Sequence, residues 1–501
     1  MCKSDSVSLA RTALATLCLV LPVWLSTPAM AQPVGLPSIG EASAADLSPA
    51  VERRLGEMII SQGRLDPTFI NDPEISQYLN KMAQRLLRHA PAGQRDIEVF
   101  ALRNPQFNAF AMPGGFIGVN SGVFALADNE SELAGVVAHE IAHVTQRHVA
   151  RGFTQSKQTN MAMMASVAAA LLAALAGGAN LAVGVAAFGQ AAAIDRQLGF
   201  SRDAESEADR IGLQMLTGAG YNPHGMETMF GKLMQTSNLN YGTSGGNTYL
   251  STHPLSIDRM TDMQNRTRAL SGKRYPDSDD FWYVRAKAVL QQSLDRPSIQ
   301  RSYEQFQDEA RRGSGVRRSA AYLALSELAV RQNDLPKAVS LLDQARQGVP
   351  ESPYLVRQQA WLNLLSGNAQ NAATLARNGL QKWPDHVALS EVLAQALQKM
   401  GQHEQAVAVL KKVVDKWPQD YPRFYQMMAS SLSSAGKPIE ARLAMAKYYE
   451  MTGAYPAAIA QLDQARQMTD NFQQQSKLDL QVRQLKNKMA RERELLKQFG
   501  A

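Results

Sequence analysis

Cysteine is almost absent from this chain of 501 residues, in which Cys2 and Cys18 are the two that occur. Both lie in an N-terminal segment with the features of a cleavable export signal, so the processed chain would contain none. A chain without cysteine forms no disulfide, which suits an oxidising compartment, and it cannot build an all-thiolate metal centre. A zinc site in it must therefore use histidine and carboxylate ligands.

The chain also lacks a block of basic residues, although 52 Lys and Arg face 45 Asp and Glu. Charges of both signs are interspersed, which is typical of a solvated surface and argues against nucleic acid as a partner. A content of 45% hydrophobic residues predicts a globular protein, and the length predicts two or three domains.

The N-terminal segment predicts export. Two basic residues precede an apolar run over residues 12–25, and the small residues Ala29 and Ala31 follow it. This order is typical of a signal peptide, here residues 1–31, and the run is short for a bilayer span. We expect the processed protein to be located in the periplasm.

Residues 32–274 carry the patterns of an α+β domain that is mostly helical. Helix-start signals stand at Ser48 and at Asp72, the second followed by proline. Residues 96–103 alternate in the manner of a strand, and residues 108–124 contain a Pro-Gly-Gly turn between apolar runs, which predicts a hairpin.

Residues 161–188 contain no charged side chain, and the length of this segment alone would suggest a membrane span. Alanine, which partitions weakly into a bilayer, dominates it, and a glycine pair at 177–178 divides it into two short halves. We expect an apolar helical hairpin or lid packed near the functional site, with a peripheral membrane contact as the alternative.

The C-terminal part repeats with a period of 34 residues from Ala320 onward. The recurring positions are prolines at Pro350, Pro384 and Pro418, tryptophans at Trp383 and Trp417, turn residues at Asn333, Gly367 and Gly401, and alanines at Ala338, Ala372 and Ala406. This is the tetratricopeptide period, in which each repeat is a pair of helices. We expect residues 278–501 to form an all-α tetratricopeptide-repeat solenoid that binds other proteins on its concave surface.

A predicted helix that Asp128 or Asn129 caps carries the sequence His139-Glu140-x-x-His143. Residues four apart lie one turn apart on the same face, so both imidazoles can bind one ion. Glu140 lies beside that face and can accept a proton from water there. This pattern predicts a zinc site that hydrolyses a bond, whereas its alternative is a pair of internally hydrogen-bonded helix histidines.

We expect the same helix to continue to Ala150. His148 lies five residues beyond His143, so on a continuous helix it points away from the metal. It is predicted to be solvated, or to support a ligand, rather than to be a ligand itself.

A catalytic zinc site needs a third protein ligand. The carboxylate-rich helix predicted over residues 199–216 offers Glu205 and Asp209 on one face. Glu205 can ligate the metal while Asp209, one turn on, orients a ligating histidine. Spacing alone leaves open Glu207 as the ligand, and also a solvated acidic face.

The segments Asn-Ala-Phe-Ala-Met-Pro-Gly-Gly, His-Glu-Ile-Ala-His and Glu-Ser-Glu-Ala-Asp occur in this order. Together they resemble the zinc metalloprotease family that includes HtpX and the CAAX prenyl proteases. The resemblance implies a zincin-like metalloprotease domain with one Zn²⁺ per chain. It further implies that Glu205 is the third ligand and that Asp209 is a catalytic residue that supports a ligand or donates a proton.

The same resemblance implies a cleft bordered by an edge strand, made here of Ala109, Phe110, Ala111 and Met112, that pairs with substrate backbone. Family members that combine an export signal, a soluble protease domain and a repeat domain imply outer-membrane β-barrel proteins as substrates, including the lipopolysaccharide transporter. They imply the β-barrel assembly machinery as a partner of the repeat domain.

His253 precedes a proline, and the family often has a similar His-Pro segment followed by an arginine, here Arg259. A turn histidine that caps a helix is one interpretation. The functional alternatives are a gating fourth zinc ligand or a group that stabilises the oxyanion. His224 is interpreted as a turn residue.

The combined prediction is a periplasmic zinc metalloendopeptidase that also acts as a chaperone-like factor, promoting assembly of outer-membrane β-barrel proteins or degrading misassembled ones. One alternative is a mainly non-proteolytic adaptor or chaperone that uses the repeat domain. The other is a membrane-associated protease, which depends on residues 161–188 alone.

Overall fold

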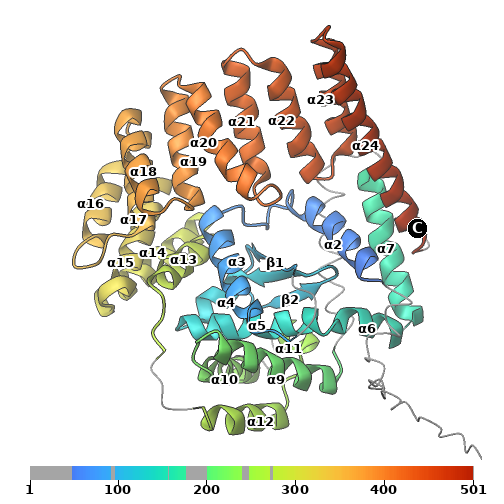
Figure 1. The fold of residues 1–501 in the computed structure, drawn as a ribbon. Coiled ribbons are helices and arrows are strands. Elements are labelled where there is room, and N and C mark those ends of the chain that lie inside the picture. Colours follow the sequence, from blue (N-terminus) through green and yellow to red (C-terminus); the bar gives the residue numbers. More distant parts are fainter. Residues whose placement is uncertain are drawn as a thin grey trace, which may run out of the picture.

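The computed structural model describes residues 48–91, 96–155, 157–175, 200–239, 248–270 and 275–499. The predicted signal peptide and the second half of the apolar segment lie outside these residues. The described chain is mostly helical with one small sheet, as predicted, and its repeat helices arch over the N-terminal elements (Figure 1).

The N-terminal part mixes helices with three strands. Its elements are α2 (Pro49–Gly63), α3 (Pro73–Leu87), β1 (Glu98–Leu102), β2 (Ala109–Met112), β3 (Phe116–Asn120), α4 (Ser121–Leu126), α5 (Glu130–Thr145), α6 (His148–Gln155), α7 (Lys157–Leu175), α9 (Arg202–Gly218), α10 (His224–Leu239), α11 (Thr248–Thr252) and α12 (Ile257–Arg268). The helix starts predicted at Ser48 and Asp72 are confirmed, because both side chains accept backbone N–H groups of the first turn.

The sheet has the strand order β1-β3-β2, in which β1 pairs with β3 in parallel and β2 pairs with β3 antiparallel. The predicted hairpin is therefore formed by β2 and β3. Its turn uses Gly114, whose φ of 81° suits glycine and whose missing side chain leaves room for the backbone of Arg53. The second strand ends earlier than predicted, at Asn120, because α4 starts at the next residue.

Helix α5 begins as predicted, since the Asn129 side chain accepts the N–H of Glu132 at 3.0 Å. The prediction that it continues to Ala150 is wrong. Arg147 adopts a φ of 54°, which breaks the helix, and its Nη2 lies 3.3 Å from the buried Glu52 carboxylate. A new helix, α6, starts at His148 after this break, which changes where that side chain points.

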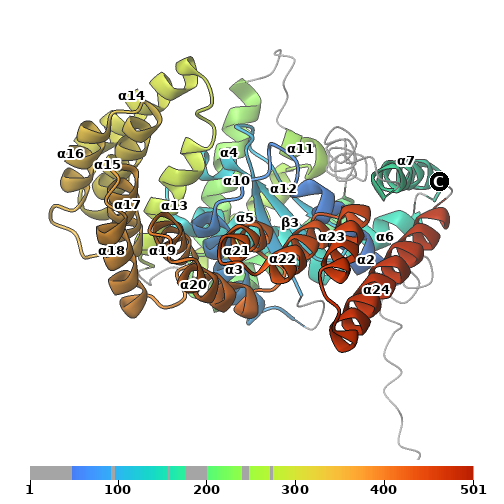
Figure 2. The ribbon, with the colours of Figure 1, turned by 90° about the horizontal axis from the view of Figure 1, so that it is seen from above.

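The described half of the apolar segment, in α7, packs against α2 and the last helix of the chain, α24 (Phe472–Lys497). Leu171 and Leu175 join an apolar cluster with Met58 and Leu496, and Arg493 donates to the carbonyl of Leu175 at 3.2 Å. The view from above shows α7 and α24 side by side (Figure 2). Within the described ranges, none of the helices combines the length and apolar character that crossing a membrane requires.

The predicted repeats form a stack of antiparallel helices. They are α13 (Asp279–Leu290), α14 (Arg296–Arg312), α15 (Gly315–Arg331), α16 (Leu335–Ala345), α17 (Pro353–Leu365), α18 (Ala369–Lys382), α19 (Val387–Lys399), α20 (His403–Lys416), α21 (Pro422–Ser434), α22 (Pro438–Met451), α23 (Tyr455–Gln467) and α24. The predicted turn residues Asn333, Gly367 and Gly401 all have positive φ, and the alanines of the second helices are buried at the helix contacts.

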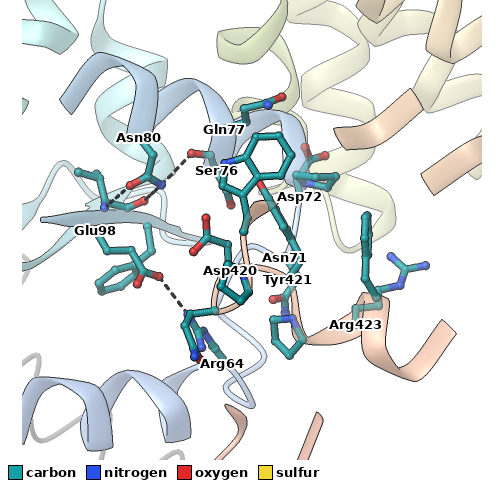
Figure 3. Close-up of a pocket in the computed structure, with 18 of the residues that line it drawn as sticks. Arg64, Asn71, Asp72, Ser76, Gln77, Asn80, Glu98, Asp420, Tyr421 and Arg423 are labelled. Carbon is teal, nitrogen blue, oxygen red and sulfur yellow. Dashed lines mark hydrogen bonds and ion pairs between the residues drawn. The ribbon is translucent and has the colours of Figure 1, made fainter. Parts of the chain in front are cut away.

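The repeats also contact the N-terminal part through charged side chains. Lys287 of α13 forms buried ion pairs with Asp72 and Glu74 at the start of α3. Further along, a groove of about 660 Å³ separates α3 and the outer edge of β1 from the turn between α20 and α21 (Figure 3). The metal-ligand candidates do not line this groove.

Candidate metal centre

His139 and His143 project from one face of α5, one turn apart. Their Nε2 atoms lie 3.0 Å from each other, and both side chains are fully buried. Burial holds the pKa of His143 well below its ordinary value, and the neighbouring His139 and His253 add to this effect. A neutral imidazole with a free lone pair is the form that binds a metal.

Glu205 reaches the two histidines from α9. Its two carboxylate oxygens each lie 3.4 Å from one Nε2 atom, Oε2 from that of His139 and Oε1 from that of His143. Gly212 allows this approach, because a side chain there would come within 3.2 Å of the backbone of α5 at His139. Burial alone would raise the pKa of Glu205, but the histidines around it hold that pKa well below the ordinary value.

His253, directly after α11, completes the cluster. Its Nδ1 lies 2.9 Å from Oε1 of Glu205 and 3.4 Å from Nε2 of His139. Candidate ligand atoms of all four residues lie within 4.8 Å of one another, and all four side chains are buried. Three imidazoles and one carboxylate converging in the buried interior fit a zinc ion, which accepts four nitrogen and oxygen ligands.

Asp209 lies behind His139, where its Oδ1 is 3.0 Å from Nδ1 of the imidazole. Burial opposes protonation of His139, but its contacts with Asp209 and Glu205 raise its pKa to about 10. Arg259 holds Asp209 in turn through two short contacts. A carboxylate that fixes the ring of a ligating histidine is a recurrent feature of zinc sites.

Glu140 is fully buried beside the four donor atoms. Its Oε1 lies 3.4 Å from the hydroxyl of Tyr249 and 3.7 Å from Nε2 of His253, and its Oε2 has no hydrogen-bond partner among the described residues. Burial raises the pKa of Glu140, while the nearby His253 and His139 oppose the increase. A carboxylate in this environment is suited to accept a proton from water.

His148 was expected to point away from the metal and to be solvated or supportive. Since the helix breaks at Arg147, the side chain turns back toward the site and is buried rather than solvated, with its Nδ1 2.8 Å from Nδ1 of His143. Glu207, considered above as a ligand, contacts His148 rather than the four donor atoms. No proline or glycine marks this break, so the sequence carried no signal for it.

The strand Ala109–Met112 is the outer strand of the sheet, opposite β1. Its side chains are buried, and α11 lies nearby, because the ring of Tyr249 packs edge-on against Phe107 at 5.2 Å. The ring of His253 stacks on Tyr249 at 4.5 Å. The segment formed by α11 and His253 thus contacts both the residue that leads into β2 and the ligand cluster.

His224 opens α10, where its Nδ1 lies 2.8 Å from Glu227.

Comparison with known families places two matches on this chain. Residues 71–267 match the model of peptidase family M48, and residues 363–431 match a tetratricopeptide-repeat model. The first match includes all the residues of the buried cluster. It implies a metal cofactor and supports metalloprotease activity, and the second indicates a protein-binding module.

Curated relatives extend the similarity to nearly the whole chain. The β-barrel assembly-enhancing protease of Escherichia coli K12 is 28% identical over 482 residues, which cover 95% of this chain and 97% of that protein. The protein of the same name from Yersinia pestis is 28% identical over 90% of this chain and 91% of its own length. The metalloprotease LoiP of E. coli is 34% identical over 32% of this chain and 59% of its own length.

Proposed function

We propose that this chain, which joins a peptidase family M48 domain to a tetratricopeptide-repeat domain, is a periplasmic zinc metalloendopeptidase with chaperone-like activity. Its clients would be outer-membrane β-barrel proteins, whose assembly it promotes or which it degrades when they are misassembled. The names of relatives that align with almost all of its length support this assignment. We take residues 32–274 as the protease domain and residues 278–501 as the repeat domain.

In this proposal His139, His143 and Glu205 bind the zinc ion. The main observation in support of this assignment is that their donor atoms converge in a buried cluster. When bound, zinc polarises the scissile carbonyl and lowers the pKa of water. Asp209 keeps the ring of His139 in the ligating orientation, with the proton on Nδ1.

Glu140 acts as the general base. Its carboxylate lies next to the ligand cluster and is screened from bulk water, so it can take a proton from the attacking water and return it to the leaving amine. Tyr249 limits where this carboxylate can lie.

His253 would be the fourth ligand of a resting state. Its Nδ1 is as close to the cluster as the other donor atoms, which favours gating over oxyanion stabilisation. Because a catalytic zinc ion keeps one position open for water, His253 must withdraw before a substrate is cleaved. Movement of α11 would withdraw it and would also uncover the approach to β2.

Strand β2 would then align the substrate backbone. The N–H of Asn120 donates to the carbonyl of Asn108 at 2.9 Å, and antiparallel pairs alternate between bonded and non-bonded positions. The backbone groups of Ala109 and Ala111 consequently face away from β3. They would form the hydrogen bonds of an added strand, whereas the side chains of Phe110 and Met112 support the sheet.

The repeat domain would bind partner proteins, among them the β-barrel assembly machinery and stalled clients such as the lipopolysaccharide transporter. The groove in Figure 3 leaves its inner surface accessible beside the protease domain. A mainly non-proteolytic adaptor remains the second candidate, because about half of the described chain consists of repeat helices.

Two measurements on the full processed chain test the proposal. Elemental analysis should find one zinc per chain, and His139→Ala should lose it. Glu140→Gln should keep the zinc and lose cleavage of an unfolded protein substrate by about 100- to 10,000-fold, the usual contribution of a general base. Glu227→Gln, at a glutamate outside the cluster, is the matched control.

Normal cleavage by Glu140→Gln would exclude this mechanism. Rescue of outer-membrane protein assembly by the same variant separates the two candidates. Full rescue favours the adaptor, and no rescue favours the protease.

A further inference from the structure

His143 has a neighbour on the side of its ring that faces away from the ligand cluster. Nδ1 of His148 lies 2.8 Å from Nδ1 of His143, and Nε2 of His148 lies 3.0 Å from Oε2 of Glu207. Arg151 donates to the same Glu207 oxygen at 2.7 Å. These contacts form one line from α5 through α6 to α9.

We propose that His148 is a positioning residue for the metal ligand His143, with Glu207 fixing the tautomer of His148 that this task needs. The inference rests on the proposed function, since it takes His143 as a zinc ligand through Nε2. It assigns to Glu207 an indirect role in place of the direct ligation that its spacing had left open.

The ring nitrogen that carries the hydrogen in His143 and in His148 can be assigned by matching each donor with an acceptor. If Nε2 of His143 binds the metal, its hydrogen is on Nδ1, and that N–H needs an acceptor. At 2.8 Å the two Nδ1 atoms can share one hydrogen, so Nδ1 of His148 must be the acceptor. The hydrogen of His148 is then on Nε2, where it is donated to the Glu207 carboxylate.

The opposite arrangement is unfavourable at both ends. A hydrogen on Nδ1 of His148 would leave its Nε2 lone pair facing the carboxylate of Glu207 at 3.0 Å. It would also make Nδ1 of His143 an acceptor, which puts the hydrogen of a neutral His143 on Nε2 and blocks the metal. Glu207 therefore selects the ligating form of His143 through His148.

The local fold is built to make this contact. After the break at Arg147, α6 starts with His148 and presents Arg151 one turn later toward α9. Arg151 holds Glu207 in place, and the ring of Phe200 lies 4.0 Å from that of His143, which restricts its rotation. His148 itself is 2% exposed, so water cannot readily substitute for it as the acceptor.

Each of the two ligating histidines is thus held by a chain of hydrogen-bonded side chains that ends at an arginine, and the chain behind His143 is longer by one residue. His139 contacts a carboxylate directly, and an arginine anchors that carboxylate, in the series His139, Asp209, Arg259. For His143 the series has one more member, because His148 stands between the ligand ring and the carboxylate of Glu207.

The test compares two variants of nearly equal size in the full processed chain. His148→Asn places an amide oxygen close to the position of Nδ1, whereas His148→Leu removes the acceptor. We expect the leucine variant to bind zinc about 10- to 100-fold more weakly, measured by competition with a chelator, and the asparagine variant to recover most of the loss. With Co²⁺ in place of zinc, the visible absorption bands should shift for leucine and return for asparagine.

Equal affinities in both variants and the parent would overturn the inference, as would an equal loss in both, which would mean that His148 only fills space. If His148→Leu does not fold, Glu207→Leu, at a partly exposed position, tests the same contact. It should also weaken zinc binding. An unchanged zinc affinity in that variant would contradict a role of Glu207 acting through His148. A parent chain that binds no zinc contradicts the proposed function instead.

Discussion

Arg259 and Asp209 form a two-point ion pair in the protein interior, with Nε 2.7 Å from Oδ2 and Nη2 2.8 Å from Oδ1. The third guanidinium nitrogen, Nη1, lies 2.8 Å from Oε2 of Glu205. One arginine from α12 therefore compensates two buried carboxylates of α9. It links the segment after His253 to the helix that supplies a candidate ligand.

Replacing this arginine should destabilise the protein strongly. Arg259→Met removes the guanidinium that contacts both buried carboxylates, and removing one partner of a buried ion pair costs about 3–5 kcal/mol. The control is Arg266→Met on the same helix, where an exposed pair with Asp262 contributes less than about 1 kcal/mol. Chemical unfolding measures both, and similar losses in the two variants would contradict this account.

Removing His253 should increase proteolysis. If His253 occupies the fourth ligand position at rest, His253→Ala opens that position, and kcat for an unfolded substrate should rise several-fold while the zinc content is unchanged. A decrease in kcat would instead support oxyanion stabilisation, and an unchanged rate would leave neither role. His224→Ala, at the start of α10, serves as the control and should leave the rate unaltered.

Stability should depend on pH through Asp420 in the groove of Figure 3. Its side chain is exposed along the groove, but the surrounding protein removes enough water to raise its pKa to about 6; Glu98 adds to the increase and Arg64 opposes it. The folded state thus binds this proton more tightly than the unfolded chain, whose ordinary pKa is 3.8. The stabilisation is complete below that value and is lost as the pH rises through about 6.

Thermal unfolding across this pH range checks the effect. The Tm of the parent minus that of Asp420→Asn should decrease from acidic to neutral pH. The matched control is Asp415→Asn, at an exposed aspartate near the end of α20 that pairs with Lys411. A constant difference between the parent and Asp420→Asn would show that Asp420 does not bind this proton.

The outward backbone of β2 can be tested with a single proline. Ala111→Pro removes an N–H that faces away from β3, so a substrate strand would lose one hydrogen bond, worth about 1 kcal/mol. We expect KM to rise about fivefold with little change in kcat. Ala111→Gly keeps the N–H and should leave KM close to that of the parent, and equal KM values for the two variants would exclude backbone pairing at this position.

Local periodicity determined much of this protein from the sequence alone. The spacing of His139 and His143 sets two imidazoles on one helical face, because the α-helix brings residues four apart together in any fold. The recurrence of glycine or asparagine, alanine and proline every 34 residues likewise predicts a helical pair and its turn, since each position has a local steric reason.

Tertiary packing alone decided the rest. No periodicity relates His253 to α5, and no glycine or proline marks the helix break at Arg147 that brings His148 to His143. The parallel pairing of β1 with β3, and the packing of α7 against α24, also join segments far apart in the chain. Such contacts depend on how whole elements pack against each other, and the order of residues within one element does not encode the neighbour that it will meet.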